Sequence, residues 1–229
     1  ADMYRFVIEH PEWISPEAQK AVDLRMGADL GRIYRVYPEG ATLRKSPRLD
    51  RMNTAELVGA LDSPNGWQRD TAQRLLVHRA DPAAIVPLKK LAATSKNPKA
   101  RMQALCTLDG LGAVDAKTLT GAWKDPHPAV REQAIRVSEP LAVQLASLAA
   151  GPQGLRGLVA SSATPQGLPA LTALVNDPAI RVRYQLAFSL GEWKSPPGME
   201  IAARLLTELA RKDFGDPHIQ TAIMSSVPA

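Results

Sequence analysis

Arginine is the residue with the most regular spacing in this 229-residue chain, and a guanidinium group can bind an anion or pair with a carboxylate. Four arginines follow a turn signal of the Asn-Gly, Asn-Pro or Asp-Pro type, and each stands three residues before an alanine or a leucine. They are Arg69, Arg101, Arg131 and Arg183, separated by 32, 30 and 52 residues. One interpretation is a basic row that binds an anionic ligand. The other is a structural role, repeated along the fold.

Cysteine and histidine offer little further chemistry. The one cysteine, Cys106, excludes an internal disulfide, a cysteine-based zinc cage and a CxxCH haem attachment within this sequence. It lies between Leu105 and Leu108 on a predicted helix, so we expect a buried thiol rather than a reactive nucleophile. His127 and His218 follow Asp-Pro in separate turns, and we interpret them as loop residues rather than a metal-binding pair.

Known catalytic motifs are missing from the sequence. It contains no glycine-rich phosphate loop, no HExxH and no GxSxG. Gly110 and Gly112 follow a predicted helix, and we interpret them as its C-terminal cap. We expect the tryptophans at related repeat positions to fill the core between repeats; these are Trp67, Trp123 and Trp193. The sequence therefore predicts no catalytic, cofactor-binding or metal-binding residue.

The composition is that of a globular, helix-rich chain. Hydrophobic residues make up 45%, charged residues 22% and aromatic residues 5%. The net charge of +5 permits polyanion binding, but 28 basic and 23 acidic residues predict a mixed surface, so nucleic-acid binding is not favoured. The stretch from 140 to 176 has a single charge, Arg156, yet its glycines and prolines argue against a membrane span.

The arginines mark an internal repeat. Segments beginning at Ser63, Lys96, Lys124 and Asn176 align, and a weaker fifth copy from Gly215 has Gln220 in the arginine position. Asn or Asp before the helix caps its free amide groups, and apolar residues then recur at helical spacing. Such units bury their apolar face only by stacking. We predict an all-α superhelix of about five units over residues 51–229, with an insertion or a degenerate unit around 140–175.

The first fifty residues follow a different pattern. Residues 33–38 alternate apolar and polar side chains as a strand does, and residues 3–8 fit a strand or a short helix. Two isolated strands need a sheet, because a lone hairpin is marginal in water. We therefore interpret residues 1–50 as the end of a β-rich domain. The basic run from Arg44 to Arg51 is expected to be a solvated linker to the array.

The repeat resembles the HEAT family, from about Met52 to Val227. The copy DPHPAVREQA is the most specific part of this resemblance, and the fold it implies is a solenoid of helical pairs. In HEAT repeats, the arginine usually binds the aspartate or a carbonyl group of an adjacent turn. The resemblance thus implies a structural ladder between repeats, formed by Arg69, Arg101, Arg131 and Arg183 with Asp125 and Asp177.

A second resemblance spans nearly the whole chain. The stretches ADMYRFVIEHPEWI and GADLGRIYRVYP, with NGWQRDTAQRLLVHR, are similar to the membrane-bound dehydrogenase-like proteins of planctomycete-type bacteria. In that family a quinoprotein-type propeller precedes a HEAT array, and a c-type cytochrome domain often follows. The resemblance implies that residues 1–50 end a propeller. It also implies an extracytoplasmic location, and pyrroloquinoline quinone and haem c in a parent protein but no cofactor in this chain.

These observations predict a non-catalytic scaffold. We expect the array to space, and to dock, the propeller and the cytochrome modules, which are its predicted protein partners. One alternative is that the chain is a fragment that takes part in catalysis by a quinone-dependent sugar or alcohol dehydrogenase. A second alternative is a nucleic-acid-binding solenoid, which predicts a basic concave face and a steep dependence of binding on salt.

Overall fold

The computed structural model describes residues 11–142, except 24–25, 28–29, 35 and 43–44, and residues 168–227. The chain divides into two compact units, Ala1–Pro47 and Arg48–Ala229. Each unit is described by itself below.

The first unit has little regular structure in its described part. It contains a 3-10 turn η1 (Pro11–Trp13) and a short helix α1 (Pro16–Ala21), which begins where the Ser15 hydroxyl accepts the amide of Ala18 at 3.2 Å. The strand prediction for residues 33–38 is wrong for those that are described: they form no strand, and Ile33 and Val36 are 91% and 97% exposed. Alternation alone does not make a strand, because a strand also needs a neighbouring strand to pair with. Residues 3–8 lie outside the described part.

The expected linker is partly folded onto the array. Leu49 begins the 3-10 turn η2 (Leu49–Arg51) and is only 3% exposed. Arg79 donates hydrogen bonds to the backbone carbonyls of Asp50 and Met52, at 3.2 and 2.5 Å. The prediction of a solvated linker up to Arg51 is therefore wrong at its end, because one buried leucine and one arginine hold the segment in place.

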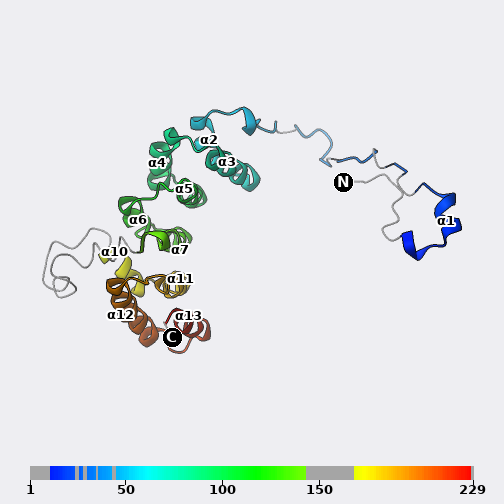
Figure 1. Cartoon of the computed structure of the whole chain (residues 1–229). Coiled ribbons are helices and arrows are strands. Elements are labelled where there is room, and N and C mark those ends of the chain that lie inside the picture. The colour runs from blue at the N-terminus through cyan, green and yellow to red at the C-terminus, as the bar shows by residue number, and fades with distance from the viewer. Residues whose placement is uncertain are drawn as a thin grey trace. The chain divides into compact units, whose positions relative to one another are not determined.

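The second unit is built from five successive helical pairs in its described part (Figure 1). The first helices of the pairs are α2 (Thr54–Ala60), α4 (Ile85–Thr94, after η3, Pro82–Ala84), α6 (Ala116–Ala122), α10 (Leu168–Thr172, continued by η5, Ala173–Asn176) and α12 (Pro196–Lys212). The second helices are α3 (Gly66–Arg79), α5 (Pro98–Gly110), α7 (Pro128–Arg136, followed by η4, Glu139–Leu141), α11 (Ile180–Leu190) and α13 (Pro217–Ser226).

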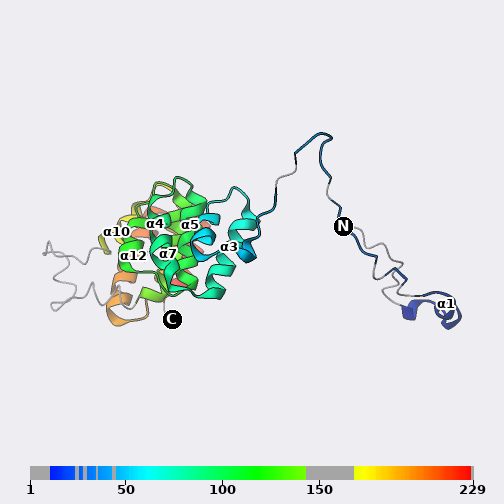
Figure 2. The same ribbon diagram turned by 90° about the horizontal axis from the view of Figure 1, so that it is seen from above.

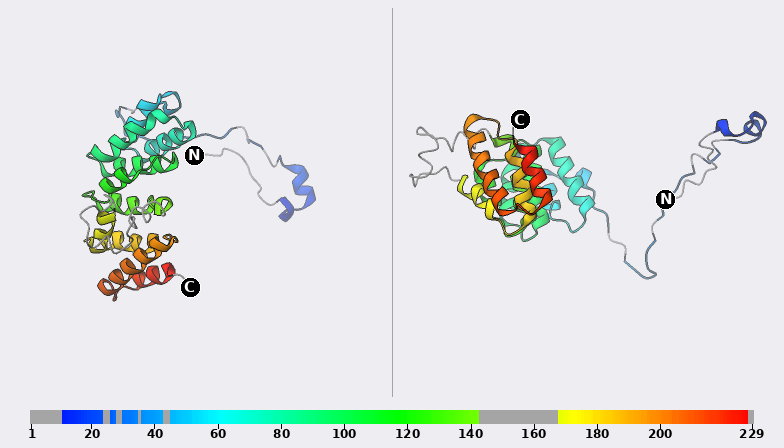
Figure 3. Two further views of the ribbon diagram at one scale, coloured as in Figure 1. Left: turned by 60° about the vertical axis from the view of Figure 1, so that its left-hand side comes forward. Right: turned by 90° about the horizontal axis from the view of Figure 1, so that it is seen from below.

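The pairs stack into an all-α, armadillo-like solenoid, which confirms the fold class predicted for the array. Helix α3 packs on α5, α5 on α7, α7 on α11, and α11 on α13, while α2, α4 and α6 stack in a second layer. Figure 1 shows that the layer from α3 to α13 lines the concave side of the arc, and Figures 2 and 3 show the two layers from other sides. We call this layer the inner face.

Local side chains explain where the helices begin and end. The side chains of Asn65 and Asn97 accept the amides of Trp67 and Lys99, at 3.0 and 3.1 Å, as predicted for capping residues. The cap that ends α5 is also as predicted. Gly112 has a φ of +62°, a conformation that glycine adopts without strain, and its amide binds the carbonyl of Asp109 at 2.9 Å.

The apolar core runs the length of the array. Alanines occupy the position three residues after the arginine in α3, α5 and α7 and are fully buried, which lets neighbouring helices approach closely. Trp123 and Trp193 are buried at 1% and 3% exposure, as predicted. Trp67 is 66% exposed, so its core assignment is wrong. It lies in the first turn of α3, two residues before Arg69, and the residues two before the arginine in α5 and α11, Lys99 and Arg181, are exposed as well. None of the described helices is long and apolar enough to cross a bilayer.

Candidate functional site

Each ladder arginine first closes its own turn. Its Nη1 donates to the backbone carbonyl six residues earlier in the chain, at 2.6 to 2.8 Å: Arg69 to Ser63, Arg101 to Ser95, Arg131 to Asp125 and Arg183 to Asp177. In the fifth unit the side-chain amide of Gln220 donates to the carbonyl of Phe214 in the same way. This bond joins the first turn of the inner helix to the loop before it.

Three of the arginines also reach the next unit. Each forms a two-pronged ion pair with an aspartate of the following turn. The pairs are Arg101–Asp125 (2.6 and 2.6 Å), Arg131–Asp177 (2.6 and 2.8 Å) and Arg183–Asp213 (2.7 and 2.7 Å). We call these three pairs the Arg–Asp ladder.

The last aspartate of the ladder was not predicted from the sequence. Asp125 and Asp177 stand six residues before an arginine, but Asp213 stands seven residues before Gln220 and ends α12. The one-residue offset hides it from the alignment of the turns. An acidic residue at the end of α12, immediately before the fifth turn, is the signal that could have identified it.

Arg69 is the exception in the set. The position that carries aspartate in the later units is Ser95 in the unit after Arg69. The Ser95 hydroxyl instead donates to Asp62 at 3.3 Å. The Nε of Arg69 is buried and has no hydrogen-bond partner among the described residues. The sequence pattern placed four arginines in the ladder, and the structure brings three of them to a carboxylate.

Burial decides what the ladder can do. Arg101, Arg131 and Arg183 are each at most 9% exposed, and the hydrogen bonds that they donate to their aspartates raise the pKa of all three guanidinium groups. The hydrogen bond from Arg183 lowers the pKa of Asp213 below its ordinary value. The three positive charges are therefore paired inside the array and form no exposed basic row. This geometry favours the structural interpretation over an anion-binding row.

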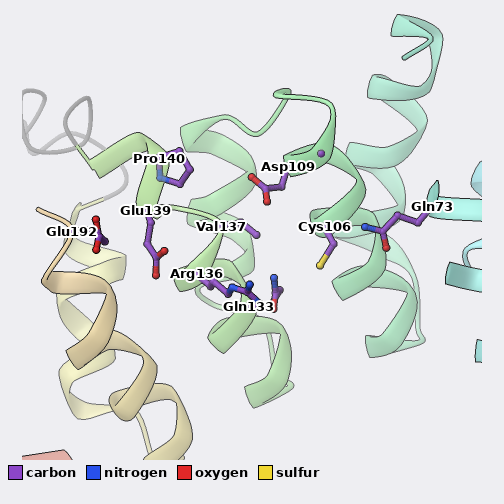
Figure 4. A pocket seen from close by; sticks show the side chains of 10 residues that line it. Gln73, Cys106, Asp109, Gln133, Arg136, Val137, Glu139, Pro140 and Glu192 are labelled. Carbon is purple, nitrogen blue, oxygen red and sulfur yellow. The ribbon is translucent and has the colours of Figure 1, made fainter. Parts of the chain in front are cut away.

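A cavity opens among the helices of the inner face (Figure 4). It has a volume of about 670 Å³ and is lined by side chains from α3, α5, α7 and η4 and by Glu192 after α11. Its lining carries three carboxylates and one guanidinium group, from Asp109, Glu139, Glu192 and Arg136. Glu139 accepts a hydrogen bond from the Ser189 hydroxyl at 2.5 Å. The cavity is therefore polar and mostly acidic.

Cys106 lines this cavity and is only partly buried, so its prediction as a core thiol is wrong. It stands five residues after Arg101, and the equivalent residues of the other units, including Arg136 and Phe188, are exposed on the inner face. Burial raises the pKa of Cys106, which keeps the thiol protonated at neutral pH and reduces its nucleophilicity. Partial burial also raises the pKa of Asp109, and the charge of Arg136 opposes this rise.

The two predicted loop histidines lie in separate units. The Nδ1 of His127 accepts the amide of Ala129 at 3.2 Å and caps α7, and the amide of His218 binds Asp216 at 2.9 Å. In the part of the chain that the structure describes, no three side chains of the His, Cys, Asp or Glu type come together in a way that could hold a metal ion.

Comparisons with known proteins give one short family match and several distant structural similarities. The first 40 residues match a family model described as a domain of unknown function (DUF7133). No curated protein matches the sequence. The architecture of the described array is that of a helical-repeat solenoid, and nothing in these comparisons concerns a dehydrogenase or a propeller.

Three solved structures are similar to the array. An engineered protein from a structural genomics consortium is 19% identical, with a TM-score of 0.43 over 76% of this chain and 78% of that one. A designed armadillo repeat protein is 14% identical, with a TM-score of 0.33 over 76% and 98% of the two chains. A second engineered protein is 17% identical, with a TM-score of 0.33 over 76% and 97%.

Proposed function

We propose that this chain is a non-catalytic scaffold and protein-interaction module of a larger quinoprotein dehydrogenase-like protein. The observation that carries the proposal is the polar cavity on the inner face, which side chains from several successive repeats build together. A surface assembled from several repeats suits an extended protein partner better than a small substrate. The dehydrogenase part of the proposal rests on the sequence resemblance described above.

The ladder supports a scaffolding role through its geometry. Each buried pair connects one inner helix to the turn that begins the next, so the spacing of the inner helices is held at three successive junctions. On the surface between α3 and α5, the side-chain amide of Gln103 donates to Gln73 and to Asp70. A partner bound at the inner face would therefore meet a fixed row of amide and carboxylate groups.

The partners that we propose are the propeller and the c-type cytochrome modules of the same or an associated polypeptide. Pyrroloquinoline quinone and haem c would belong to those modules and not to this chain. An extracytoplasmic location follows if the modules are of the kind that the resemblance implies. The acidic lining of the cavity favours a basic surface on whichever module binds there.

Cys106 provides a direct test, because it is the only cysteine in the chain and lines the cavity. The chain is labelled at Cys106 with benzophenone-maleimide. The labelled chain is then mixed with the purified propeller and cytochrome modules of the source organism and irradiated. We expect a covalent product with one of the two modules. The matched control moves the label to the other layer through C106S and V86C, since Val86 on α4 is 76% exposed. Equal products from both positions, or no product with either module, would overturn the proposal.

The nucleic-acid alternative is less well supported by the same geometry. It requires free basic groups along the concave side, and three of the four repeated arginines are buried and paired with aspartates. Fluorescence anisotropy with a labelled DNA duplex at low and high salt separates the alternatives. A steep salt dependence of tight binding would favour the nucleic-acid function over the scaffold.

A further inference from the structure

The junction between α3 and α5 differs from the three ladder junctions in what its arginine binds. At each ladder junction, the edge of the guanidinium group that carries Nε and Nη2 donates two hydrogen bonds to one carboxylate, at 2.6 to 2.8 Å. We call this side of the group the Nε–Nη2 edge. In Arg69 the Nε is buried and has no hydrogen-bond partner among the described residues. The bond of Arg69 to the Ser63 carbonyl comes from Nη1, so it leaves this edge for another acceptor.

Ser95 stands where the ladder units have aspartate, and it fulfils one of the two roles of that residue. Asp125 and Asp177 each accept the amide two residues later, at 2.8 and 2.9 Å, and each also binds the arginine of the preceding unit. The Ser95 hydroxyl accepts the amide of Asn97 at 3.1 Å in the same way. Serine has one oxygen where aspartate has two. The turn is therefore closed, while the role toward Arg69 is left unfilled.

Arg69 is also more accessible than the ladder arginines. Arg69 and Ser95 are both half-buried, whereas the ladder arginines are at most 9% exposed. A Cβ atom on Gly66 would lie 3.5 Å from Nη2 of Arg69, so glycine leaves this edge without a side-chain neighbour from its own turn. The equivalent residues of the ladder units all have a side chain and are Pro98, Pro128 and Ile180. Because Nε itself is covered, an outside group reaches it by a small movement of the side chains around it.

The charges around the junction favour an anion. Asp62 is exposed, and its two oxygens accept hydrogen bonds from the Ser95 hydroxyl at 3.3 Å and from the side-chain amide of Asn97 at 2.9 Å. These bonds hold its carboxylate on the turn before α5. Lys96 and Lys99 add two exposed positive charges to the same turn. Asp62 weakens the attraction of a second anion and the two lysines oppose this effect, so we expect a site of low affinity.

We propose that the α3–α5 junction is a binding site for a carboxylate group from outside the array, held by the Nε–Nη2 edge of Arg69. Three equivalent arginines of the same fold bind a carboxylate with this edge. A buried N–H group without a partner costs free energy, and a ligand that accepts its hydrogen bond recovers part of that cost. The carboxylate belongs to an acidic side chain of a partner protein or to a small organic acid, since both present the same group. The site does not depend on the scaffold function proposed above.

Nuclear magnetic resonance of the full chain, labelled with the heavy nitrogen isotope, tests this proposal because it observes arginine Nε–H groups individually. Arg69→Lys identifies the signal of Arg69 by its loss and keeps the positive charge. Sodium acetate is titrated to about 500 mM, with sodium chloride of the same ionic strength as the reference. We expect the Arg69 signal to move toward the signals of the ladder arginines and to saturate, with a Kd of about 100 mM.

Ser95→Asp should abolish this titration, because an internal carboxylate then binds the Nε–Nη2 edge. In that variant the Arg69 signal should lie near those of the ladder arginines before acetate is added. The matched control is Val86→Asp, which adds the same charge at an exposed residue of α4 and should titrate like the natural sequence. Circular dichroism of each variant establishes that the helices are intact.

A second probe, a short polyglutamate peptide with blocked ends, separates the two sources of the carboxylate. Tighter binding of the peptide than of acetate, per carboxylate, would indicate an acidic segment of a partner protein. Binding of acetate without the peptide would indicate a small organic acid, and both results support the site. The proposal is overturned by an Arg69 signal that does not move, that moves without saturating, or that moves equally in Ser95→Asp.

Discussion

Two neighbouring junctions, α3 with α5 and α5 with α7, have an arginine at the same repeat position. The two arginines differ in the partner that they find in the next unit. In both, the arginine donates to the carbonyl six residues earlier, at 2.8 Å. Only Arg101 then finds an aspartate in the next unit, while Arg69 finds Ser95 in that place and keeps a buried Nε without a partner among the described residues. The difference shows that the arginine has two separable tasks, one within its own turn and one between units.

The two interactions of the arginine also differ in how many units contain them. The bond within the turn occurs in all five units, and even Gln220 makes it, whereas the pair between units occurs in three. A repeated arginine in this kind of sequence is therefore evidence for a closed turn. It is evidence for an ion pair between units only when the turn of the next unit carries an acidic residue. The variants below test this distinction.

The largest effect is expected from Asp177→Ala. This carboxylate binds Arg131 and also accepts the amide of Ala179 at 2.9 Å, and both side chains of the pair are buried. Removing it leaves a buried guanidinium without a partner, so the free energy of unfolding should fall by about 3 kcal/mol or more. Urea denaturation followed by circular dichroism measures the change. Glu208→Ala, at an exposed residue, serves as the control, and a loss no larger than the control's would contradict a role for the ladder in stability.

The next effect is a gain in stability. Ser95→Asp places a carboxylate where the later units have one and should supply the partner that Arg69 lacks. We expect the free energy of unfolding to rise by about 1 kcal/mol, because a charge-assisted bond forms while the nearby Asp62 opposes the new charge. The same substitution in an Arg69→Gln background should give no gain. Equal gains in both backgrounds would mean that the new aspartate acts on the turn alone.

A smaller effect on stability is expected from the ion pair between Lys89 of α4 and Asp115, which caps the start of α6. Asp115 accepts hydrogen bonds from Lys89 and Thr118. Burial alone would raise the pKa of Asp115, but these hydrogen bonds outweigh it and lower the pKa to about 2, from an ordinary value of 3.8. The stabilisation should be complete above the ordinary value and lost as the pH falls toward 2.

Because Asp115 is partly exposed, this contribution should be below about 1 kcal/mol. Unfolding free energies measured between neutral pH and pH 2 should fall less steeply for Asp115→Asn than for the natural sequence. Parallel curves for the two proteins would refute the assignment.

The smallest effect is expected from an exposed pair at the junction that also holds Arg131 and Asp177. Arg181 and Glu132 pair across α7 and α11, with the arginine side chain 57% exposed. Glu132→Gln should lower the free energy of unfolding by only about 0.3 kcal/mol, and the loss should vanish in about 1 M salt, where exposed charges are screened. Thermal unfolding at low and high salt measures it. A loss comparable with that of Asp177→Ala would remove burial as the explanation for the strength of the ladder.

The parts of the fold that the sequence could predict are those set by local interactions. Asn97 begins α5 and Gly112 ends the same helix through bonds within a few residues, so both could be recognised from residue type and spacing. The repeat itself was visible because Arg101, Arg131 and Arg183 recur after similar turns. A local pattern of this kind survives in the structure because few other conformations satisfy the same backbone groups.

The parts that could not be predicted depend on neighbours distant in the chain. Cys106 and Glu192 line the same cavity from different repeats, and no spacing in the sequence reveals that they share it. Trp67 has the residue type of a core position, but it stands at a place on its helix that is exposed in other units too, as at Lys99 and Arg181. The predicted strand at Ile33 fails because alternation shows that a segment could pair but does not supply the partner strand.

The number of residues between the two partners of a ladder pair differs from one junction to the next, and this difference shows where the array tolerates insertions. Arg101 and Asp125 are 24 residues apart, whereas Arg131 and Asp177 are 46 apart, yet both pairs form with the same two-pronged geometry. Closing a loop of about twice the length costs only about 0.6 kcal/mol more in chain entropy. The connection between η4 and α10 is thus a position where a lineage can add sequence without disturbing the register of the repeats, and where an engineer could insert a whole domain.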